Sequence, residues 1–229
     1  MSCMKRKIRQ REFGFVHWGG KRRGAGRKPS GERAGVSHAK RAKLAARFPV
    51  LVTMKLCDGL QTLRVREANT LVRAAIAAGR REDFRVVEYS LQETHLHALI
   101  EASDESSLSR AMNGLATRIA RGLNRLWQRA GRVFAERYHA LYLTTPRAVR
   151  NALVYVLQNA RKHRAWRAFA PDAYSSAPWF AGWKGRIEKG AESRSGILER
   201  ARTWLLSIGW RRHGLIDPLE VPVGAEVWM

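Results

Sequence analysis

The order of strand-like and helix-like segments between residues 49 and 163 restricts the fold more than any other feature of the sequence. Residues 49–56, 83–92, 93–102 and 132–145 are rich in β-branched and aromatic residues, whereas residues 66–79, 105–128 and 146–163 have helical periodicity. The order β-α-β-β-α-β-α is typical of a small antiparallel sheet covered by helices, of ferredoxin-like type. We therefore expect an α/β (α+β) domain of this type over residues 48–163.

The helical segment 105–128 has the clearest amphipathic pattern in the chain. Its apolar residues recur at intervals of three and four, which predicts a single buried face. That face is formed by Leu108, Met112, Leu115, Ile119, Leu123 and Leu126. This helix is therefore expected to supply much of the core on one side of the sheet.

Two segments flank the expected domain. Residues 1–47 contain fifteen Lys and Arg against two acidic residues and show little hydrophobic periodicity, so they are expected to form a basic, flexible DNA-binding arm. Residues 164–229 hold six of the eight tryptophans and one pattern that predicts an amphipathic helix from Ile197 to Ile208. We expect this part to be a helical and irregular C-terminal extension.

The charge of the chain indicates the chemistry of its partner. Lys and Arg number 43 against 19 Asp and Glu, which gives a formal net charge of +24 and a pI of about 11.4. A charge of this size favours a polyanionic partner such as nucleic acid. No run of 18 apolar residues and no signal-type segment occurs, so we expect no membrane partner and a cytoplasmic protein.

The N-terminal stretch KRRGAGRKPSG, residues 21–31, is the first candidate DNA contact. Glycines let its backbone lie flat while guanidinium groups reach phosphates or a narrow minor groove. The candidate contacts are Arg22, Arg23, Arg27 and Lys28. A solvated flexible tail remains the alternative for sequence recognition.

A second basic feature lies on the helical segment 105–128. A stripe of arginines runs about 120° around the helix from its apolar face, with no acidic residue among them. It consists of Arg110, Arg118, Arg121, Arg125 and Arg129. Such a stripe is often only the solvated side of a helix, but its uniform sign favours a contact with nucleic acid.

Two histidines one residue apart interrupt an apolar strand-like run. His95 and His97 point to the same side of a strand, because successive residues alternate between its two faces. Two imidazoles on one pleat can chelate a single ion. The alternative is a pair of packed or solvent-facing histidines, since such pairs are common.

The helical segment 146–163 carries a tyrosine and an asparagine one turn apart. Tyr155 lies nearly opposite the apolar side of this helix, flanked by Asn151, Asn159 and Lys162. The phenol of Tyr155 and the amide oxygen of Asn159 can therefore approach the same point. An oxygen ligand beside two imidazoles suits Mg²⁺ or Mn²⁺ better than a closed zinc site.

These motifs resemble the REP-associated tyrosine transposases, which belong to the single-tyrosine HUH transposases named for a His-hydrophobic-His motif. The similar stretches are THLHALIEA at 94–102, GRVFAERYHALYLTTPRAVRNALVYVLQNARKH at 131–163 and the leader GAGRKP at 24–29. The resemblance implies a fold of HUH endonuclease type. It also implies that His95, His97 and Asn159 bind a divalent cation and that Tyr155 is the nucleophile.

The same resemblance implies a reaction and an assembly. Tyr155 would attack single-stranded or hairpin DNA and form a 5′-phosphotyrosine, and Lys162 would be a further contact to the DNA. The protein would act as a homodimer and would be associated with a prokaryotic nucleoid. Thr94 departs from the relatives, which often have Asn at that position. This puts the support of the first histidine in doubt.

Two other functions fit the same residues. A noncatalytic basic nucleic-acid-binding protein would need only the charge, and its two histidines would be incidental. An HUH replication initiator or relaxase would share the tyrosine chemistry and differ in its DNA substrate.

Overall fold

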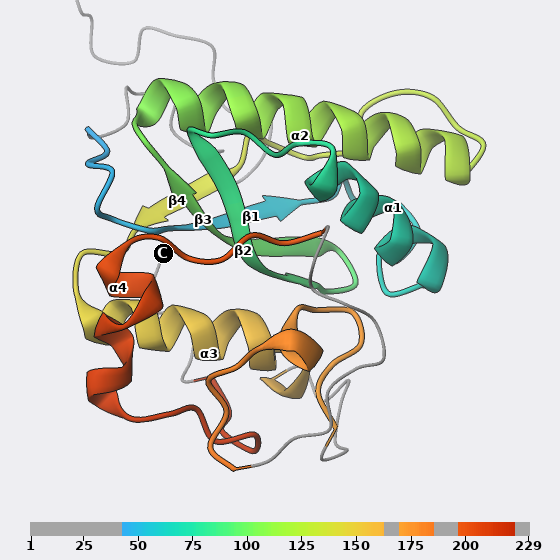
Figure 1. Ribbon diagram of the computed structural model, residues 1–229. Coiled ribbons are helices and arrows are strands. Elements are labelled where there is room, and N and C mark those ends of the chain that lie inside the picture. The colour runs from blue at the N-terminus through green and yellow to red at the C-terminus, as the bar shows by residue number, and fades with distance from the viewer. Residues whose placement is uncertain (1–42, 163–169, 186–196, 223–229) are drawn as a thin grey trace, which may run out of the picture. The chain divides into compact units, whose positions relative to one another are not determined.

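The computed structural model describes residues 43–162, 170–185 and 197–222 (Figure 1). The chain divides into two compact units, Met1–Gly35 and Val36–Met229, and every described residue belongs to the second. The predicted DNA contacts of the basic arm, Arg22, Arg23, Arg27 and Lys28, lie outside the described residues. Among the helices that are described, none is long and apolar enough to cross a membrane.

The centre of the fold is a four-stranded antiparallel sheet with the strand order β2-β3-β1-β4. The strands are β1 (Val50–Lys55), β2 (Phe84–Leu91), β3 (His95–Ala102) and β4 (His139–Tyr142). The main helices are α1 (Arg66–Ala77), α2 (Glu105–Leu126) and α3 (Pro146–Lys162). The predicted class, an antiparallel sheet with helices, is confirmed.

Helices cover both faces of the sheet (Figure 1). On one face, α1 and α2 pack against Val50, Val52, Leu96 and Ala98. On the other face, α3 packs with residues of the C-terminal segment, including α4 (Trp204–Ser207) and the 3₁₀ helix η2 (Gly209–His213). The sheet is therefore the middle layer between two separate apolar cores.

Two helices begin where the sequence predicts. The Asp104 carboxylate accepts a 2.7 Å hydrogen bond from the Ser107 amide at the start of α2. At α3, the Thr145 hydroxyl accepts a 3.1 Å hydrogen bond from the Ala148 amide, and Pro146 is the first helical residue. Leu126, predicted to lie in the core, is 37% exposed because α2 ends there.

The expected strand at 132–145 is shorter than predicted. Only His139–Tyr142 joins the sheet as β4. Before it, the Arg132 guanidinium donates to the carbonyl groups of Phe134 and Ala135, which are therefore not part of a regular ladder. The backbone of this stretch joins the end of β1 only through an isolated antiparallel bridge, with hydrogen bonds from the Cys57 amide to the Val133 carbonyl and from the Ala135 amide to the Lys55 carbonyl.

The amphipathic stretch 197–208 forms a helix only at its end. The buried Glu101 carboxylate accepts hydrogen bonds from the Arg202 and Thr203 amides at 2.9 Å each, and the Glu199 amide donates to Val86. These tertiary bonds hold the backbone outside a helix until α4 begins at Trp204. The prediction of a helix from Ile197 was wrong for this reason.

The C-terminal segment also covers an edge of the sheet. β2 is an edge strand, and the Leu91 amide donates to Tyr174 at 2.8 Å while the Ser176 amide donates to Tyr89 at 2.9 Å. An uncovered edge strand would present a row of unpaired backbone groups. The described residues beyond position 170 therefore complete the fold of the sheet.

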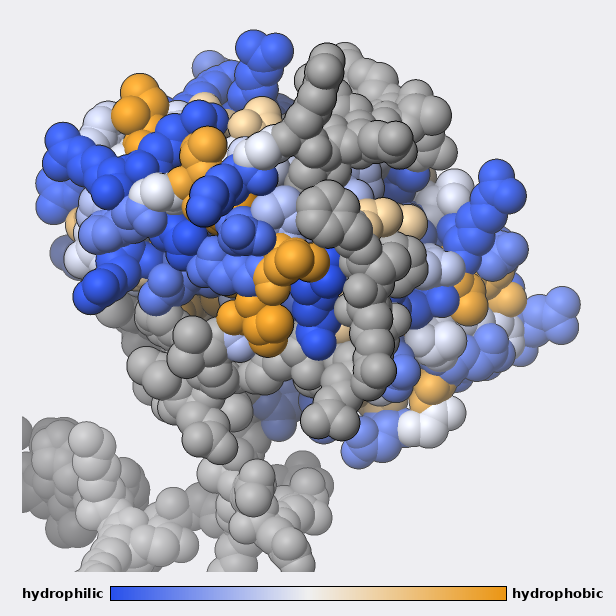
Figure 2. Space-filling model, turned by 90° about the horizontal axis from the view of Figure 1, so that it is seen from below, coloured by the Kyte–Doolittle hydropathy of each residue, from blue (hydrophilic) through white to orange (hydrophobic). Residues whose placement is uncertain are grey.

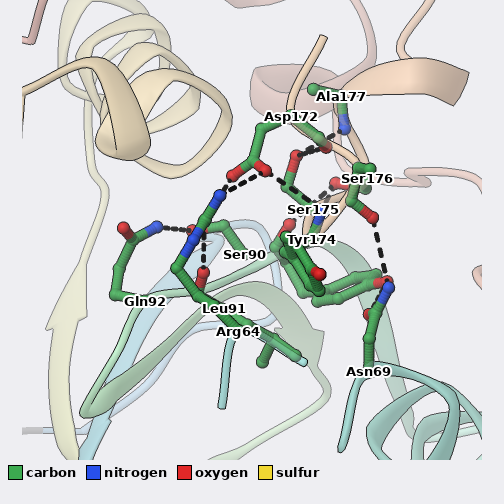
Figure 3. A network of polar contacts seen from close by, with 12 residues as sticks. Arg64, Asn69, Ser90, Leu91, Gln92, Asp172, Tyr174, Ser175, Ser176 and Ala177 are labelled. Atoms are coloured by element: carbon green, nitrogen blue, oxygen red, sulfur yellow. Dashed lines mark hydrogen bonds and ion pairs between the residues drawn. The ribbon is translucent and has the colours of Figure 1, made fainter. Parts of the chain in front are cut away.

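A buried ion pair anchors this covering segment (Figure 3). Both terminal nitrogens of Arg64 donate to the Asp172 carboxylate at 2.9 Å, and Nη1 also donates to the Leu91 carbonyl. The Arg64 guanidinium carbon lies 4.8 Å from the centre of the Tyr174 ring. Asn69 on α1 adds a 3.1 Å hydrogen bond to the Ala173 carbonyl. The segment is thus tied to both α1 and β2.

We predict that Asp172→Asn lowers the free energy of unfolding by about 3 kcal/mol, because it leaves the Arg64 guanidinium, whose side chain is only 12% exposed, without its counter-ion. Chemical denaturation measures this change. Asp58→Asn is the matched control, since its carboxylate lies 3.7 Å from Lys55 at a fully exposed site. Equal stability of the two variants would contradict the proposed anchoring.

Candidate functional site

Polar side chains gather at one end of the sheet, on the face that α3 covers. His95 and His97 lie on this face of β3, as their spacing predicts, while Leu96 lies in the core on the opposite face. In the register of β1 and β3, Thr53 is opposite His97 and Lys55 is opposite His95. Two neighbouring strands thus contribute four polar residues to one end of the sheet.

The outer strands extend this polar group. Ser90 on β2 is opposite His97, and His139 on β4 is opposite Thr53. Directly opposed residues share a face of the sheet. One row therefore crosses all four strands and consists of Ser90, His97, Thr53 and His139. His139 is exposed at the outer end of the row, whereas Ser90 is buried.

Threonine hydroxyl groups orient both imidazoles. Thr53 Oγ1 and His97 Nδ1 share a 2.9 Å hydrogen bond, and Thr94 Oγ1 and His95 Nδ1 share another of 2.9 Å. The two rings are parallel within 1°, with centroids 6.0 Å apart. A cation held by both rings would bind at Nε2. Thr94 thus supports the first histidine through its own hydroxyl.

Tyr155 on α3 lies against this pair of histidines. Its ring meets the His97 ring edge-on, with centroids 4.9 Å apart and an interplanar angle of 75°. His97 is buried and Tyr155 is half-buried. A tyrosine and a histidine that are far apart in sequence therefore come into contact within one chain.

Asn159, one turn beyond Tyr155, is the most unusual polar group in this layer. Its side chain is 1% exposed, and neither its oxygen nor its nitrogen has a hydrogen-bond partner among the described residues. Leaving a buried polar group without a partner costs about 1–3 kcal/mol. Such a group indicates a ligand that satisfies it when bound.

The described residues contain no group of three or more His, Cys, Asp and Glu side chains that could hold a metal ion. A cation at His95 and His97 would therefore take its third protein ligand from another kind of side chain. The buried amide of Asn159 has the required oxygen donor, and Mg²⁺ and Mn²⁺ accept such oxygen ligands. The residues present fit a divalent cation.

Burial determines the acidity of the tyrosine. Removal from water raises the pKa of the Tyr155 hydroxyl above its ordinary value, and the neighbouring Asn159 amide opposes this shift. The amide lies beside the hydroxyl without forming a hydrogen bond of normal geometry. At neutral pH the phenol is therefore protonated, and an attack by its oxygen requires a group that stabilises the phenolate.

The surroundings of α3 differ from the expected solvated polar side. The C-terminal segment covers part of the helix, where Gln158 Nε2 donates to the Pro218 carbonyl at 2.8 Å and Arg150 pairs with Glu220 at 2.7 Å. Asn159 is buried, whereas Tyr155 is half-buried and keeps part of its side chain accessible. Lys162 ends α3, and its side chain lies outside the described part of the chain.

The arginine stripe of α2 lies on the other side of the sheet. Arg110, Arg118, Arg121 and Arg125 are exposed, and α2 packs on the face opposite α3. The structure therefore does not bring these arginines to Tyr155. Arg110 lies 3.5 Å from Asp83, and Arg129 donates to Asn124 at 2.8 Å, so protein groups already engage parts of the stripe. Contact with DNA by these arginines stays a prediction.

Thr53, Lys55 and His139 were not identified from the sequence. A signal was present, because Thr53 and Lys55 are two residues apart at the end of an otherwise apolar strand and must share a face. Their proximity to His97 depends on the pairing of β1 with β3 and β4. The pattern of a single strand does not contain that information.

Comparison with known proteins finds similarity to solved structures but not to family models or curated sequences. No family model matches the chain, and no curated protein matches it. Among solved structures, the chain is similar to one described as the REP-associated tyrosine transposase bound to a REP hairpin, with a TM-score of 0.49 and 15% sequence identity. The match covers 73% of this chain and 99% of that chain. Because the likeness is weak, we base the function on the side chains described above.

We predict that the free energy of unfolding falls more steeply with pH above about 10 in the wild type than in Tyr155→Phe. The raised pKa keeps the folded phenol protonated while the unfolded phenol ionises, so stability present below this pH is lost as the pH rises through the folded pKa. Denaturation at a series of alkaline pH values measures the difference. Tyr174→Phe controls for the number of tyrosines, and equal slopes for wild type and Tyr155→Phe would contradict the shift.

Proposed function

We propose that the protein is a DNA strand transferase of the transposase class, which cleaves and rejoins single-stranded or hairpin DNA through Tyr155. The observation that carries this proposal is the contact of Tyr155 with the His95–His97 pair beside the buried, unpartnered amide of Asn159. A nucleophile, two imidazoles and an oxygen donor are the parts that metal-assisted phosphoryl transfer requires.

His95, His97 and Asn159 would hold a divalent cation, Mg²⁺ or Mn²⁺. When bound, the cation supplies Lewis-acid stabilisation of negative charge on the scissile phosphate. Thr53 and Thr94 hold the two imidazoles in position through Nδ1. Hydrogen bonds of this kind fix the ring orientation of metal-binding histidines in other proteins.

The reaction proceeds by in-line substitution at phosphorus. The Tyr155 oxygen forms a bond to the phosphorus, and the bond from phosphorus to the 3′-oxygen of the preceding nucleotide breaks. The tyrosine loses its proton, and the departing 3′-oxygen gains one as a free hydroxyl. The products are a 5′-phosphotyrosine and a DNA strand with a 3′-hydroxyl.

The half-buried position of Tyr155 affects the acidity of its hydroxyl group. Because burial raises its pKa, the phenol does not ionise spontaneously near neutral pH, and unwanted attack on other phosphates is suppressed. The Lys55 ammonium group, opposite His95 on the neighbouring strand and half-exposed, would attract the incoming phosphate. The nucleophile then becomes active only when substrate and cation are in place.

Rejoining is the reverse of cleavage. A 3′-hydroxyl attacks the phosphotyrosine, forms a new phosphodiester and releases Tyr155 with its proton. The covalent intermediate conserves the energy of the original phosphodiester, so strand transfer needs no nucleotide cofactor. This property suits a protein that moves a DNA segment to a new strand.

The assembly and the class of DNA are further parts of the proposal. A homodimer follows from the resemblance of the motifs to REP-associated tyrosine transposases, and one chain already brings Tyr155 to His97. The net charge of +24 favours a nucleic-acid substrate. The same chemistry in a replication initiator or relaxase would act on a different DNA; palindromic repeats flanking the gene would favour transposition, and a plasmid origin beside it would favour replication or transfer.

One observation favours a noncatalytic alternative. The exposed arginines of α2 lie on the face of the sheet opposite Tyr155, where they would bind DNA without presenting it to the nucleophile. A nucleic-acid-binding protein of this kind would show an affinity that falls steeply with salt. It would show no covalent chemistry.

We predict that wild-type protein incubated with labelled DNA hairpins and Mn²⁺ forms a covalent adduct, and that Tyr155→Phe forms none because the attacking oxygen is absent. Denaturing gel electrophoresis detects the adduct. Tyr174→Phe, which removes a half-buried tyrosine elsewhere, should retain it. An adduct that survives Tyr155→Phe would exclude Tyr155 as the nucleophile, and the absence of any adduct would favour the noncatalytic alternative.

A further inference from the structure

A hollow lies at the other end of β3 from the histidines, on the same face of the sheet as His97. It is a pocket of about 390 Å³ whose lining includes Arg47, Glu101, Ser103, Arg202, Thr203 and Trp204. Glu101 and His97 are four residues apart on one face of β3, which separates them by about 13 Å. The pocket is therefore distinct from the group around Tyr155.

The floor of the pocket is a fully bonded carboxylate. Glu101 is 4% exposed and accepts hydrogen bonds from the Arg202 amide, the Thr203 amide, the Thr203 hydroxyl at 2.8 Å and Arg85 at 3.3 Å. With its lone pairs engaged in this way, Glu101 acts as an anchor for the backbone and not as a ligand-binding group. The side chains of Arg202 and Trp204 are thereby held at the rim.

Trp204 presents a large aromatic surface at this rim. Its residue is 47% exposed, although tryptophan normally buries most of its area. A Cβ atom added at Gly209 would lie 2.7 Å from the Trp204 ring, so the glycine backbone packs directly against the indole. The ring is thus supported by backbone while about half of the residue remains accessible.

Seen from the α3 side, hydrophobic residues form separate small patches on a predominantly hydrophilic surface (Figure 2). A stable protein interface usually has a wide apolar surface, whereas the surface around Trp204 has one exposed aromatic side chain among arginines. The chemistry around Trp204 is instead that of a platform for an aromatic, negatively charged ligand.

The charges near Trp204 favour an anion. Arg85 neutralises Glu101, and Asp83 lies within 3.5 Å of both Arg81 and Arg110. Arg47 and Arg202 are exposed, and neither forms an ion pair with an acidic residue in the described ranges. The Arg212 guanidinium carbon lies 4.8 Å from the centre of the Trp204 ring. With Arg85 paired to Glu101 and Asp83 paired outside the pocket, the lining keeps two unpaired arginines, Arg47 and Arg202, against one carboxylate, Glu82.

We propose that this pocket binds an unpaired nucleotide of a nucleic-acid strand. The base stacks on the exposed part of the Trp204 ring, and Arg47 and Arg202 contact the flanking phosphates. Stacking on an exposed aromatic ring combined with basic side chains is the general chemistry of single-strand binding. The proposal requires no activity of Tyr155, so it stands or falls separately from the proposed reaction.

The test compares two ligands that differ only in their bases. Full-length protein carrying Tyr155→Phe, which excludes covalent capture, is titrated with short oligothymidylate and with an abasic oligonucleotide of the same length, and binding is followed by fluorescence anisotropy. Basic segments contact phosphates and contribute equally to both ligands. The affinity ratio therefore isolates stacking, and we expect a preference of about 5- to 150-fold for oligothymidylate.

Variants assign this preference to the pocket. Trp204→Ala should abolish the preference, whereas Trp204→Phe, which keeps an aromatic ring, should retain most of it. Arg202→Gln, which keeps the backbone bond to Glu101, should weaken both ligands by a similar factor. The control Ile208→Ala removes a 60% exposed side chain one turn further on, outside the pocket, and should leave the ratio unchanged.

Two results would overturn the proposal. One is an equal affinity of the parent protein for both oligonucleotides. The other is a preference that survives Trp204→Ala, which would place stacking on a different aromatic residue. If wild-type protein forms no covalent adduct with DNA, this result contradicts only the proposed catalysis and not the nucleotide pocket.

Discussion

The alternation of side chains along β3 is the constraint on which the rest of this protein depends. Leu96, Ala98 and Ile100 enter the core under α1 and α2, while His95, His97, Leu99 and Glu101 face α3. The second set supplies two imidazoles, an apolar contact and a carboxylate within one strand. A shift of one residue would turn the histidines into the core under α1 and α2 and would move Leu96 to the polar end on the α3 side.

Two kinds of buried polar group can be distinguished among the described residues. Asp172 and Glu101 are saturated with hydrogen bonds from Arg64, Arg202 and Thr203, and they hold the C-terminal segment onto the sheet. Asn159 lies on α3, and its amide has no hydrogen-bond partner among the described residues. The first kind stabilises the fold, whereas the second costs free energy in the absence of a ligand. This contrast is why we propose a ligand-binding role for Asn159.

The sequence predicts those features that depend on local periodicity. The order of strands and helices, the common face of His95 and His97, and the one-turn spacing of Tyr155 and Asn159 all follow from the repeats of single elements. The structure adds what tertiary bonds impose: Glu101 prevents a helix over 197–203, and Arg64 docks the residues around Asp172. The contributions of Thr53 and His139 depend on strand pairing, which no single segment encodes.

The most direct test of the central claim is paramagnetic broadening by Mn²⁺ in full-length protein that is labelled for NMR. If His95, His97 and Asn159 bind one cation, substoichiometric Mn²⁺ should broaden the two imidazole resonances and the Asn159 side-chain amide first, and excess Mg²⁺ should restore them. If these signals stay sharp while those of acidic residues elsewhere broaden, the three side chains do not form a cation site, and the account of Tyr155 as a metal-assisted nucleophile is wrong.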